Sequence, residues 1–437
     1  MTDRGLPRVL VITSNNFNLR GGGGITLTNL FRGWPADRLA NVHEDATPED
    51  RSVCTSFYRL TGREVRWAWP LSSLESRLTG RDPAEGTTAV AQDGGSQWNA
   101  RRWLIGDGWP RTVTISPALA GWIDAFGPTL AYGFLGSFAQ VRLLQTIADR
   151  WNLPVAVHMM DDWPAVLYRR GLLAPVLRRK LLREFRAVLH RATLKLAICD
   201  AMAREYERRY GGVFGVFHNA LQMQEWLPSA RRAWDVARPA RVGYIGSILG
   251  EAQRAAIRDV AEAVLEMRQR GRDLRLAVAA PEAHCQPLRA WGFPEEALEI
   301  TPAPPASEVP RRMAEADINL LPFNFDKASA RYLRYSMPTK VPAYMISGTP
   351  ILVYGPAGLA AVEYAQHAGW GHVVTRRGAL HLRPALERLL DDAPYRRALG
   401  TTAQHCAAKN HDIERVRERF WGALTAAASG DGSLRCP

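Results

Sequence analysis

The sequence has no apolar run that approaches the roughly 18 residues needed to span a bilayer. Residues 1–8 are polar and lead directly into a short apolar run, which is not the pattern of a signal peptide. These absences predict a cytoplasmic protein. Cysteine is also scarce, and no Cys-x-x-Cys pair occurs among Cys54, Cys199, Cys285, Cys406 and Cys436. The sequence therefore predicts neither a zinc site nor a disulfide framework.

The chain also lacks the short motifs of several ligand-binding classes. It has no Walker loop, no spaced Gly-x-Gly-x-x-Gly, no recognised nucleic-acid motif and no stripe of interleaved basic and aromatic residues. Nucleic acid is therefore not an expected partner. What is present is an excess of positive charge, because 56 Lys and Arg against 43 Asp and Glu give +13. Such an excess favours anionic partners, among them acidic membranes and phosphorylated small molecules.

The length of 437 residues, with 46% hydrophobic and 23% charged residues, predicts two or three globular domains. In the first half, helical stretches at 137–151 and 172–192 alternate with short apolar runs at 8–13, 129–132, 154–158 and 194–198. This alternation is typical of a doubly wound α/β domain, which we place at residues 1–226. The glycine-rich residues 79–110 do not fit the alternation and are interpreted as an ordered insertion or a mobile loop.

A second α/β series follows from residue 241. A long amphipathic pattern covers 251–270, and strand-like runs lie at 241–246, 274–279, 317–321 and 350–354. Residues 227–239 contain two prolines and no clear periodicity, which predicts a linker. We place the second domain at 241–408 and expect the amphipathic residues 409–437 to pack back on the first. Two Rossmann-like doubly wound domains should face each other across a cleft, where the carboxyl ends of their strands bind ligands.

The first candidate for a ligand site is the glycine run that follows the first strand. Gly22, Gly23 and Gly24 precede an apolar pattern at helical spacing. Glycines let a backbone approach a ligand closely, and a helix N-terminus offers free N–H groups to an anion. A turn that binds nothing is the alternative, since the run matches no specific motif.

A stronger candidate lies within residues 332–356. A helix is predicted to begin near Met337 and Pro338, with Ser336 as its cap and Lys340 in its first turn. A cation there opposes the helix dipole, whereas an anion bound at the helix start would reverse the sign of that cost. The alternative is a solvated lysine, but Thr339, Lys340 and Gly348-Thr349-Pro350 belong to one unit.

This segment resembles the donor-binding motif of bacterial GT-B glycosyltransferases related to glycosyltransferase family 4. In that family a helix carries Pro-x-Lys-x-x-Glu-Tyr ahead of a Gly-x-Pro strand. The same pattern begins here at Pro338 and reaches Tyr344, with Gly-Thr-Pro at 348–350. Other stretches match in the same order along the chain: the glycine run and residues 157–158, 199–202, 218–220 and 243–247.

The resemblance implies the GT-B fold and transfer of a sugar from a nucleoside-diphosphate sugar. It also implies donor-binding residues, which are Gly22, Gly23, Gly24, Ser247, Tyr335, Ser336, Thr339 and Lys340. Two positions depart from the family pattern. Ala343 stands where the family has the acidic residue that holds the ribose, and the turn at 246–250 contains no basic residue. Arg254 could replace the missing basic residue, but its spacing from the strand differs from that of the family.

The catalytic candidates follow the apolar run at 154–158. His158, Asp161 and Asp162 lie at a strand end, where α/β folds bind ligands. Either carboxylate could deprotonate an acceptor hydroxyl in an inverting enzyme, and His158 would position the donor sugar in a retaining one. The structural alternative is that a carboxylate caps a helix and His158 belongs to the core.

A basic amphipathic stretch runs from Arg169 to Lys195. Its apolar residues recur at three- and four-residue steps, so it either packs on the sheet or also contacts an anionic membrane peripherally. A lipid-linked glycan or a polysaccharide is the acceptor that this stretch favours.

The sequence therefore predicts a metal-independent glycosyltransferase that needs no cofactor besides its sugar-nucleotide substrate. It contains no Asp-x-Asp triplet of the metal-dependent kind, since Asp161 and Asp162 are adjacent. The alternatives are a sugar-nucleotide epimerase of the same architecture, or a non-catalytic nucleotide- or sugar-binding subunit, which the departure at Ala343 would favour.

Overall fold

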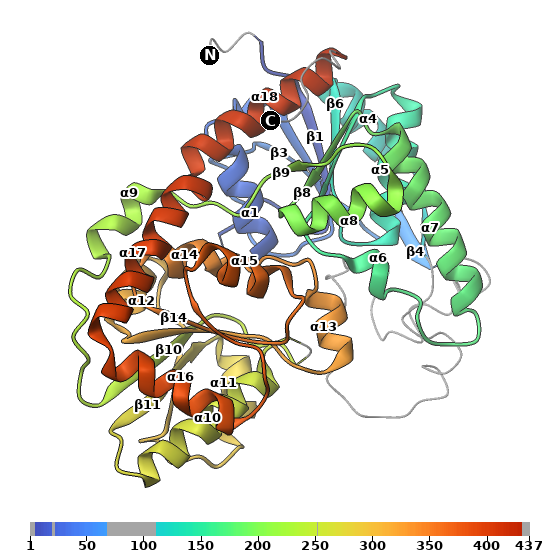
Figure 1. The fold of residues 1–437 in the computed structure, drawn as a ribbon. Coiled ribbons are helices and arrows are strands. Elements are labelled where there is room, and N and C mark those ends of the chain that lie inside the picture. The colour runs from blue at the N-terminus through green and yellow to red at the C-terminus, as the bar shows by residue number, and fades with distance from the viewer. Residues whose placement is uncertain (1–4, 20–21, 68–110, 251, 431–437) are drawn as a thin grey trace. The chain divides into compact units, whose positions relative to one another are not determined.

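The computed structural model describes residues 5–19, 22–67, 111–250 and 252–430 (Figure 1). The predicted insertion at 79–110 lies outside these residues. The chain forms two compact units, which we call unit 1 (Met1–His218 and Val416–Pro437) and unit 2 (Asn219–Arg415). The chain therefore crosses between the units twice.

Unit 1 is built on a seven-stranded sheet of order β3-β2-β1-β6-β7-β8-β9, in which every strand pairing is parallel. The central strands are buried along their whole length, as expected of parallel strands covered on both faces. Two short strands, β4 (Val65–Trp67) and β5 (Arg111–Val113), form a separate antiparallel pair. The sheet contains β1 (Val9–Thr13), β2 (Leu39–His43), β3 (Ser56–Arg59), β6 (Leu130–Phe134), β7 (Val155–Met159), β8 (Leu194–Ala197) and β9 (Gly215–Val216).

Helices cover the sheet of unit 1 (Figure 1). Local signals start them: Ser116 and Ser137 accept hydrogen bonds from the third backbone N–H after them and so cap α4 and α5. The helices among the described residues of this unit are α1 (Gly22–Phe31), η1 (Ala36–Arg38), α4 (Pro117–Phe126), α5 (Phe138–Arg150), α6 (Trp163–Val166), α7 (Ala174–Arg191), α8 (Asp200–Tyr210) and most of α18 (Ile413–Ser429).

The C-terminal helix α18 supplies side chains to the core of unit 1. The ring of Phe420 lies edge-on to Phe31 and Tyr132, with centroids 5.2 and 5.7 Å apart. Trp421 donates a hydrogen bond of 2.9 Å from Nε1 to the Leu30 carbonyl and packs edge-on against Trp34. Edge-to-face aromatic pairs add about 0.5–1.5 kcal/mol each beyond burial, so this helix stabilises the unit.

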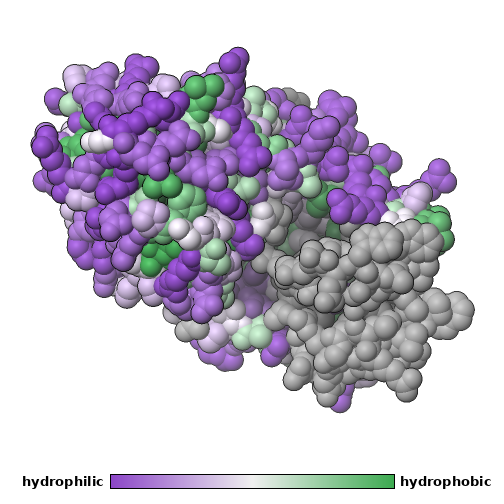
Figure 2. All heavy atoms as spheres, turned by 90° about the horizontal axis from the view of Figure 1, so that it is seen from below, coloured by the Kyte–Doolittle hydropathy of each residue, from purple (hydrophilic) through white to green (hydrophobic). Residues whose placement is uncertain are grey.

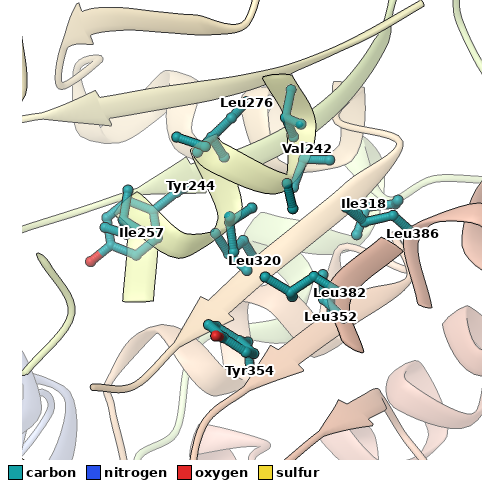
Figure 3. Close-up of a cluster of buried hydrophobic side chains, with 14 of the residues drawn as sticks. Val242, Tyr244, Ile257, Leu276, Ile318, Leu320, Leu352, Tyr354, Leu382 and Leu386 are labelled. Atoms are coloured by element: carbon teal, nitrogen blue, oxygen red, sulfur yellow. The ribbon is translucent and has the colours of Figure 1, made fainter. Parts of the chain in front are cut away.

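Unit 2 has a six-stranded sheet of order β12-β11-β10-β13-β14-β15, again with parallel pairings throughout. Its core lies between this sheet and α10 and α16, where Val242, Leu320 and Leu352 meet Ile257 and Leu386 (Figure 3). The strands are β10 (Ala240–Ile245), β11 (Leu274–Ala280), β12 (Leu298–Pro302), β13 (Ile318–Pro322), β14 (Ile351–Tyr354) and β15 (His372–Val374).

The helices of unit 2 alternate with these strands along the chain. They are α9 (Met223–Trp226), η3 (Leu227–Ser229), α10 (Arg254–Gln269), α11 (Glu282–Arg289), η4 (Ala306–Glu308), α12 (Val309–Glu315), α13 (Lys327–Leu333), α14 (Lys340–Ile346), α15 (Ala360–Ala368), α16 (Ala379–Asp391) and α17 (Ala393–Asn410). No helix in the described part of the chain is both long enough and apolar enough to cross a membrane.

The α/β fold class and the strand–helix alternation predicted from the sequence are confirmed in both units. Residues 227–239, which the sequence predicted to be a linker, instead bind to unit 2 through side-chain contacts. Arg231 forms an ion pair of 3.1 Å with the buried Asp317, and Trp234 Nε1 donates to the Gly348 carbonyl at 3.0 Å. Of the two prolines that suggested a linker, Pro228 lies in the short helix η3 and Pro239 directly precedes β10.

Candidate functional site

The candidate site of unit 2 lies where strand β10 ends. After Ile245 the chain turns through Gly246, whose φ of +134° is a conformation that favours glycine. Lys340, the first residue of α14, lies directly against this turn: a Cβ added at Gly246 would be 2.9 Å from Lys340 Nζ. Glycine is therefore needed at position 246 for two reasons: the positive φ of the backbone and the close approach of Lys340.

Lys340 is a half-buried cation whose hydrogen-bond partner is a tyrosine. Its Nζ donates a hydrogen bond of 2.6 Å to the Tyr244 hydroxyl and lies 4.0 Å from the centre of the same ring. It forms no ion pair with any carboxylate in the described ranges. Burial lowers the pKa of Lys340 to about 7. A ligand that brings negative charge would stabilise the protonated form of a lysine in this environment.

Two tyrosines hold the turn beside Lys340. The Tyr244 hydroxyl donates to the Ser247 carbonyl at 2.6 Å, and the Tyr344 hydroxyl accepts a hydrogen bond of 3.2 Å from the Ile245 N–H. Ser247 itself is exposed. Of the predicted donor-binding residues, Ser247 and Lys340 are thus brought together, with Tyr244 bonded to both. Sequence reasoning missed Tyr244 because an aromatic residue inside a strand reads as core.

Arg254 marks the other end of the turn. It is the first residue of α10, and its guanidinium lies 3.7 Å from the position of a Cβ on Gly250. It forms no ion pair among the described residues, and its buried Nε has no hydrogen-bond partner there. The nearby His284 accepts from the Ile248 N–H at 3.1 Å, and burial followed by the Arg254 charge lowers the pKa of His284. The turn therefore has an unpaired cation at each end.

The structure corrects the predicted start of the helix that carries Lys340. Helix α14 begins at Lys340 and not near Met337, with Thr339 at the cap position and no side-chain cap bond. The Val341 N–H donates to the Pro338 carbonyl at 3.0 Å, which makes a tight turn before the helix. The predicted cap, Ser336, is buried and donates its hydroxyl to the Tyr332 carbonyl at 3.3 Å.

The remaining predicted donor residues lie near α14 or in the other unit. Thr339 is exposed and directly precedes Lys340, whereas Tyr335 is half-buried in the segment after α13. Gly22, Gly23 and Gly24 belong to unit 1 and form the first turn of α1, not a loop. A Cβ on Gly23 would collide with the Asn15 side chain, and one on Gly24 with that of Asn18. Close packing therefore explains these two glycines.

His158 lies inside the core of unit 1. It is fully buried on β7, its Nδ1 hydrogen-bonds the Tyr132 hydroxyl at 2.7 Å, and Phe134 and Phe420 pack against its ring. Burial lowers the pKa of His158 to about 3, so the imidazole is neutral at physiological pH. This environment corresponds to the core alternative considered for the sequence.

The two carboxylates after β7 have different environments. Asp162 is buried, and its carboxylate accepts from the Arg209 guanidinium at 2.9 Å and from the Tyr206 hydroxyl at 2.9 Å. Burial raises the pKa of Asp162 although the Arg209 charge opposes the shift. These two partners hold the Asp162 carboxylate in place. Asp161 is half-buried and is the candidate with access to solvent.

Two loops that match the family pattern meet in unit 1. His218 Nε2 lies 3.4 Å from the Asp200 carboxylate, and this contact lowers the pKa of Asp200. No group of three or more His, Cys, Asp or Glu residues in the described part of the chain has the geometry to hold a metal ion.

A scan against protein-family models finds no match, and no curated protein is significantly similar in sequence. Solved structures do match over the whole chain. Anabaena HepE in complex with UDP is 14% identical over 96% of this chain and 100% of that chain, with a TM-score of 0.62. Sucrose-phosphate synthase from Thermosynechococcus elongatus is 14% identical over 97% and 99%, with a TM-score of 0.65. WaaG, a glycosyltransferase of lipopolysaccharide biosynthesis, is 13% identical over 95% and 99%, with a TM-score of 0.57.

These matches span both units and nearly the full length of each neighbour. Each unit here also has the parallel sheet and flanking helices that the sequence predicts. The chain therefore has the two-domain α/β fold of these glycosyltransferases, the GT-B fold.

Proposed function

We propose that this protein is a glycosyltransferase that moves a sugar from a nucleoside-diphosphate sugar to an acceptor hydroxyl. The observation that carries the proposal is the ammonium group of Lys340, which lies against the turn after β10 and forms no ion pair with a residue that the structure describes. A diphosphate at the carboxyl edge of the sheet would provide the missing anion. HepE, which shares the fold, was solved with UDP and with UDP-glucose, and this supports a nucleotide-sugar ligand.

The charges of the site fit the bond that breaks. The bond between the sugar anomeric carbon and the diphosphate oxygen is cleaved, the acceptor oxygen bonds to that carbon, and the hydroxyl proton leaves to a base. Negative charge develops on the departing diphosphate. Lys340 and Arg254 would stabilise this charge, so we propose that no divalent metal is required.

We assign the donor to unit 2 and the acceptor to unit 1. Asp161 is the base that we propose, because it lies just after β7 and is half-buried, whereas Asp162 is only 1% exposed. His158 would act only by keeping that strand end in shape through Tyr132. A lipid-linked glycan or a polysaccharide remains the acceptor class that the basic surface of α7 favours.

A non-catalytic binding subunit is the main alternative. Position 343 carries a buried alanine, so this position offers no carboxylate to the nucleotide ribose. A subunit of this kind would bind the nucleotide without turning over the donor. A sugar-nucleotide epimerase would instead consume the donor without an acceptor and release a modified sugar nucleotide or its sugar.

The experiment is a thermal-shift panel with UDP, GDP, dTDP, ADP and CMP, each with EDTA and with Mg²⁺. A ligand at a hundredfold excess over its Kd stabilises the folded state by about 2.7 kcal/mol. A shift with one nucleoside diphosphate in EDTA supports the metal-free donor site and identifies the nucleobase of the donor. Release of that diphosphate from its sugar nucleotide, dependent on a glycan acceptor, distinguishes a transferase from the alternatives. No shift with any nucleotide contradicts the proposal.

A further inference from the structure

Few large apolar side chains are exposed among the residues that the structure describes, and the face in Figure 2 is mostly hydrophilic. Three of the exposed ones lie within five residues of one another. Leu172, Leu173 and Val176 are 66%, 37% and 68% exposed at the start of α7 and in the turn before it. We call these three side chains the apolar tip. They are not the stripe that packs on unit 1, because that stripe is formed farther along the helix by Leu181, Phe185, Val188 and Leu189.

The apolar tip is surrounded in sequence by cations alone. Residues 163–183 contain no Asp or Glu and include Arg169, Arg170, Arg178, Arg179, Lys180 and Arg183. Two of these cations, Arg178 and Arg169, donate hydrogen bonds to backbone carbonyls. The Arg178 guanidinium donates to the Pro164 and Leu167 carbonyls at 3.1 and 3.0 Å, and Arg169 Nε donates to the Ala165 carbonyl at 2.8 Å. These bonds fix the turn that presents the tip.

The other cations of this stretch are available to a partner. Arg170, Arg179, Lys180 and Arg183 form no ion pair with any carboxylate in the described ranges, and both Arg179 and Arg183 are exposed. The first acidic residue after them, Glu184, is already paired with Arg142 at 3.3 Å. Exposed apolar groups beside unpaired cations are the composition by which peripheral proteins bind anionic bilayers.

We propose that the start of α7 binds an anionic lipid bilayer, with the apolar tip among the lipids and the four cations at the headgroups. A second copy of this chain fits poorly, since it would bring the same cations face to face. A nucleic acid would use the cations but would leave the three apolar side chains without a partner. This inference goes beyond the proposed function, because it needs neither the donor site nor sugar transfer.

The test is co-sedimentation of the full chain with phosphatidylglycerol–phosphatidylcholine vesicles and with phosphatidylcholine vesicles. We expect binding to the anionic vesicles to exceed binding to the neutral ones at least about tenfold and to weaken as salt increases. The triple variant Leu172→Ser, Leu173→Ser, Val176→Ser should lose most of the binding. Its control is Leu380→Ser, which alters a leucine that is 67% exposed in unit 2.

The charge is tested by Arg179→Gln with Arg183→Gln, which should lower vesicle binding at least about threefold. The matched control is Arg270→Gln with Arg312→Gln, two exposed arginines of unit 2 that form no ion pair among the described residues. Equal loss in test and control variants, equal binding to neutral vesicles, or loss confined to RNA binding or self-association would overturn the proposal. UDP binding measured on the same variants should not change, so failure here is separate from failure of the donor site.

Discussion

The ammonium group of Lys340 lies against Tyr244, with Nζ 2.6 Å from the hydroxyl oxygen and 4.0 Å from the ring centre. The same hydroxyl donates to the Ser247 carbonyl, so one tyrosine holds both the cation and the turn after β10. This arrangement orients Lys340 before a ligand arrives. A cation that is already oriented loses less conformational freedom when it binds an anion.

Tyr244→Phe should weaken nucleotide binding while leaving the fold intact. The substitution keeps the ring but removes the acceptor for Lys340 and the donor for Ser247. We expect a loss of roughly 1 kcal/mol in unfolding free energy and an affinity for the diphosphate several-fold lower. Calorimetric titration and thermal unfolding measure the two effects, and an unchanged affinity would mean that Lys340 does not depend on Tyr244.

Gly246→Ala should damage the same site from the backbone side. A side chain there strains a φ of +134° and would bring its Cβ to 2.9 Å from Lys340 Nζ. The matched control is Gly271→Ala, whose φ is +85° and whose Cβ would have no neighbour within 4 Å. Both variants should lose about 1–3 kcal/mol of stability. Only Gly246→Ala should also lose nucleotide affinity, and equal affinities in the two variants would contradict the geometry.

Much of this fold could be predicted from the sequence, and the reason is physical. Strands such as β1 and β7 are buried on both faces, so they form continuous apolar runs that stand out against the helices between them. Two of the missed strands are less apolar: β2 reads Leu-Ala-Asn-Val-His and β3 reads Ser-Phe-Tyr-Arg. β3 is an edge strand without full burial, which leaves no such pattern.

The site could be predicted where a residue is unfavourable for stability unless a ligand binds beside it. Lys340 opposes its helix dipole, and that signal is visible in the sequence. His158, Asp161 and Asp162 shared one signal, the end of a strand, and the sequence cannot show which of them is buried by partners distant in sequence. Arg209 and Phe420, which decide the environments of Asp162 and His158, lie on α8 and α18.

His158→Asn should destabilise unit 1 without a change in UDP affinity. The asparagine keeps a hydrogen-bonding atom for Tyr132 but loses ring packing, at roughly 2 kcal/mol. The pKa of His158 is about 3 in the fold against 6.5 ordinarily, so between these values the unfolded chain binds the extra proton. Wild-type stability should therefore fall as pH drops below 6.5, and His158→Asn should fall less steeply. A loss of nucleotide affinity would contradict this and would indicate that His158 contributes to nucleotide binding.

The Asp162–Arg209 ion pair should be structural. Asp162→Ala leaves a part-buried guanidinium without this partner, and Arg209→Ala leaves a buried carboxylate, so each should cost roughly 3 kcal/mol. The double variant should lose clearly less than the sum of the single losses, since neither partner is then left alone. Urea unfolding of the four proteins measures the coupling. Strictly additive losses would show that the pair does not interact as the geometry indicates.

The most direct measurement is the pH dependence of the binding constant of the matching nucleoside diphosphate, in EDTA, for wild type, Lys340→Arg and Lys340→Ala. Burial sets the pKa of Lys340 at about 7 in the free protein. Affinity should therefore fall as pH rises from about 7 to about 9, because protonating the amine becomes part of binding. Lys340→Arg should bind without this decline, and Lys340→Ala should bind at least about tenfold more weakly at pH 7. Equal affinity of wild type and Lys340→Ala across the range would contradict a donor site at Lys340.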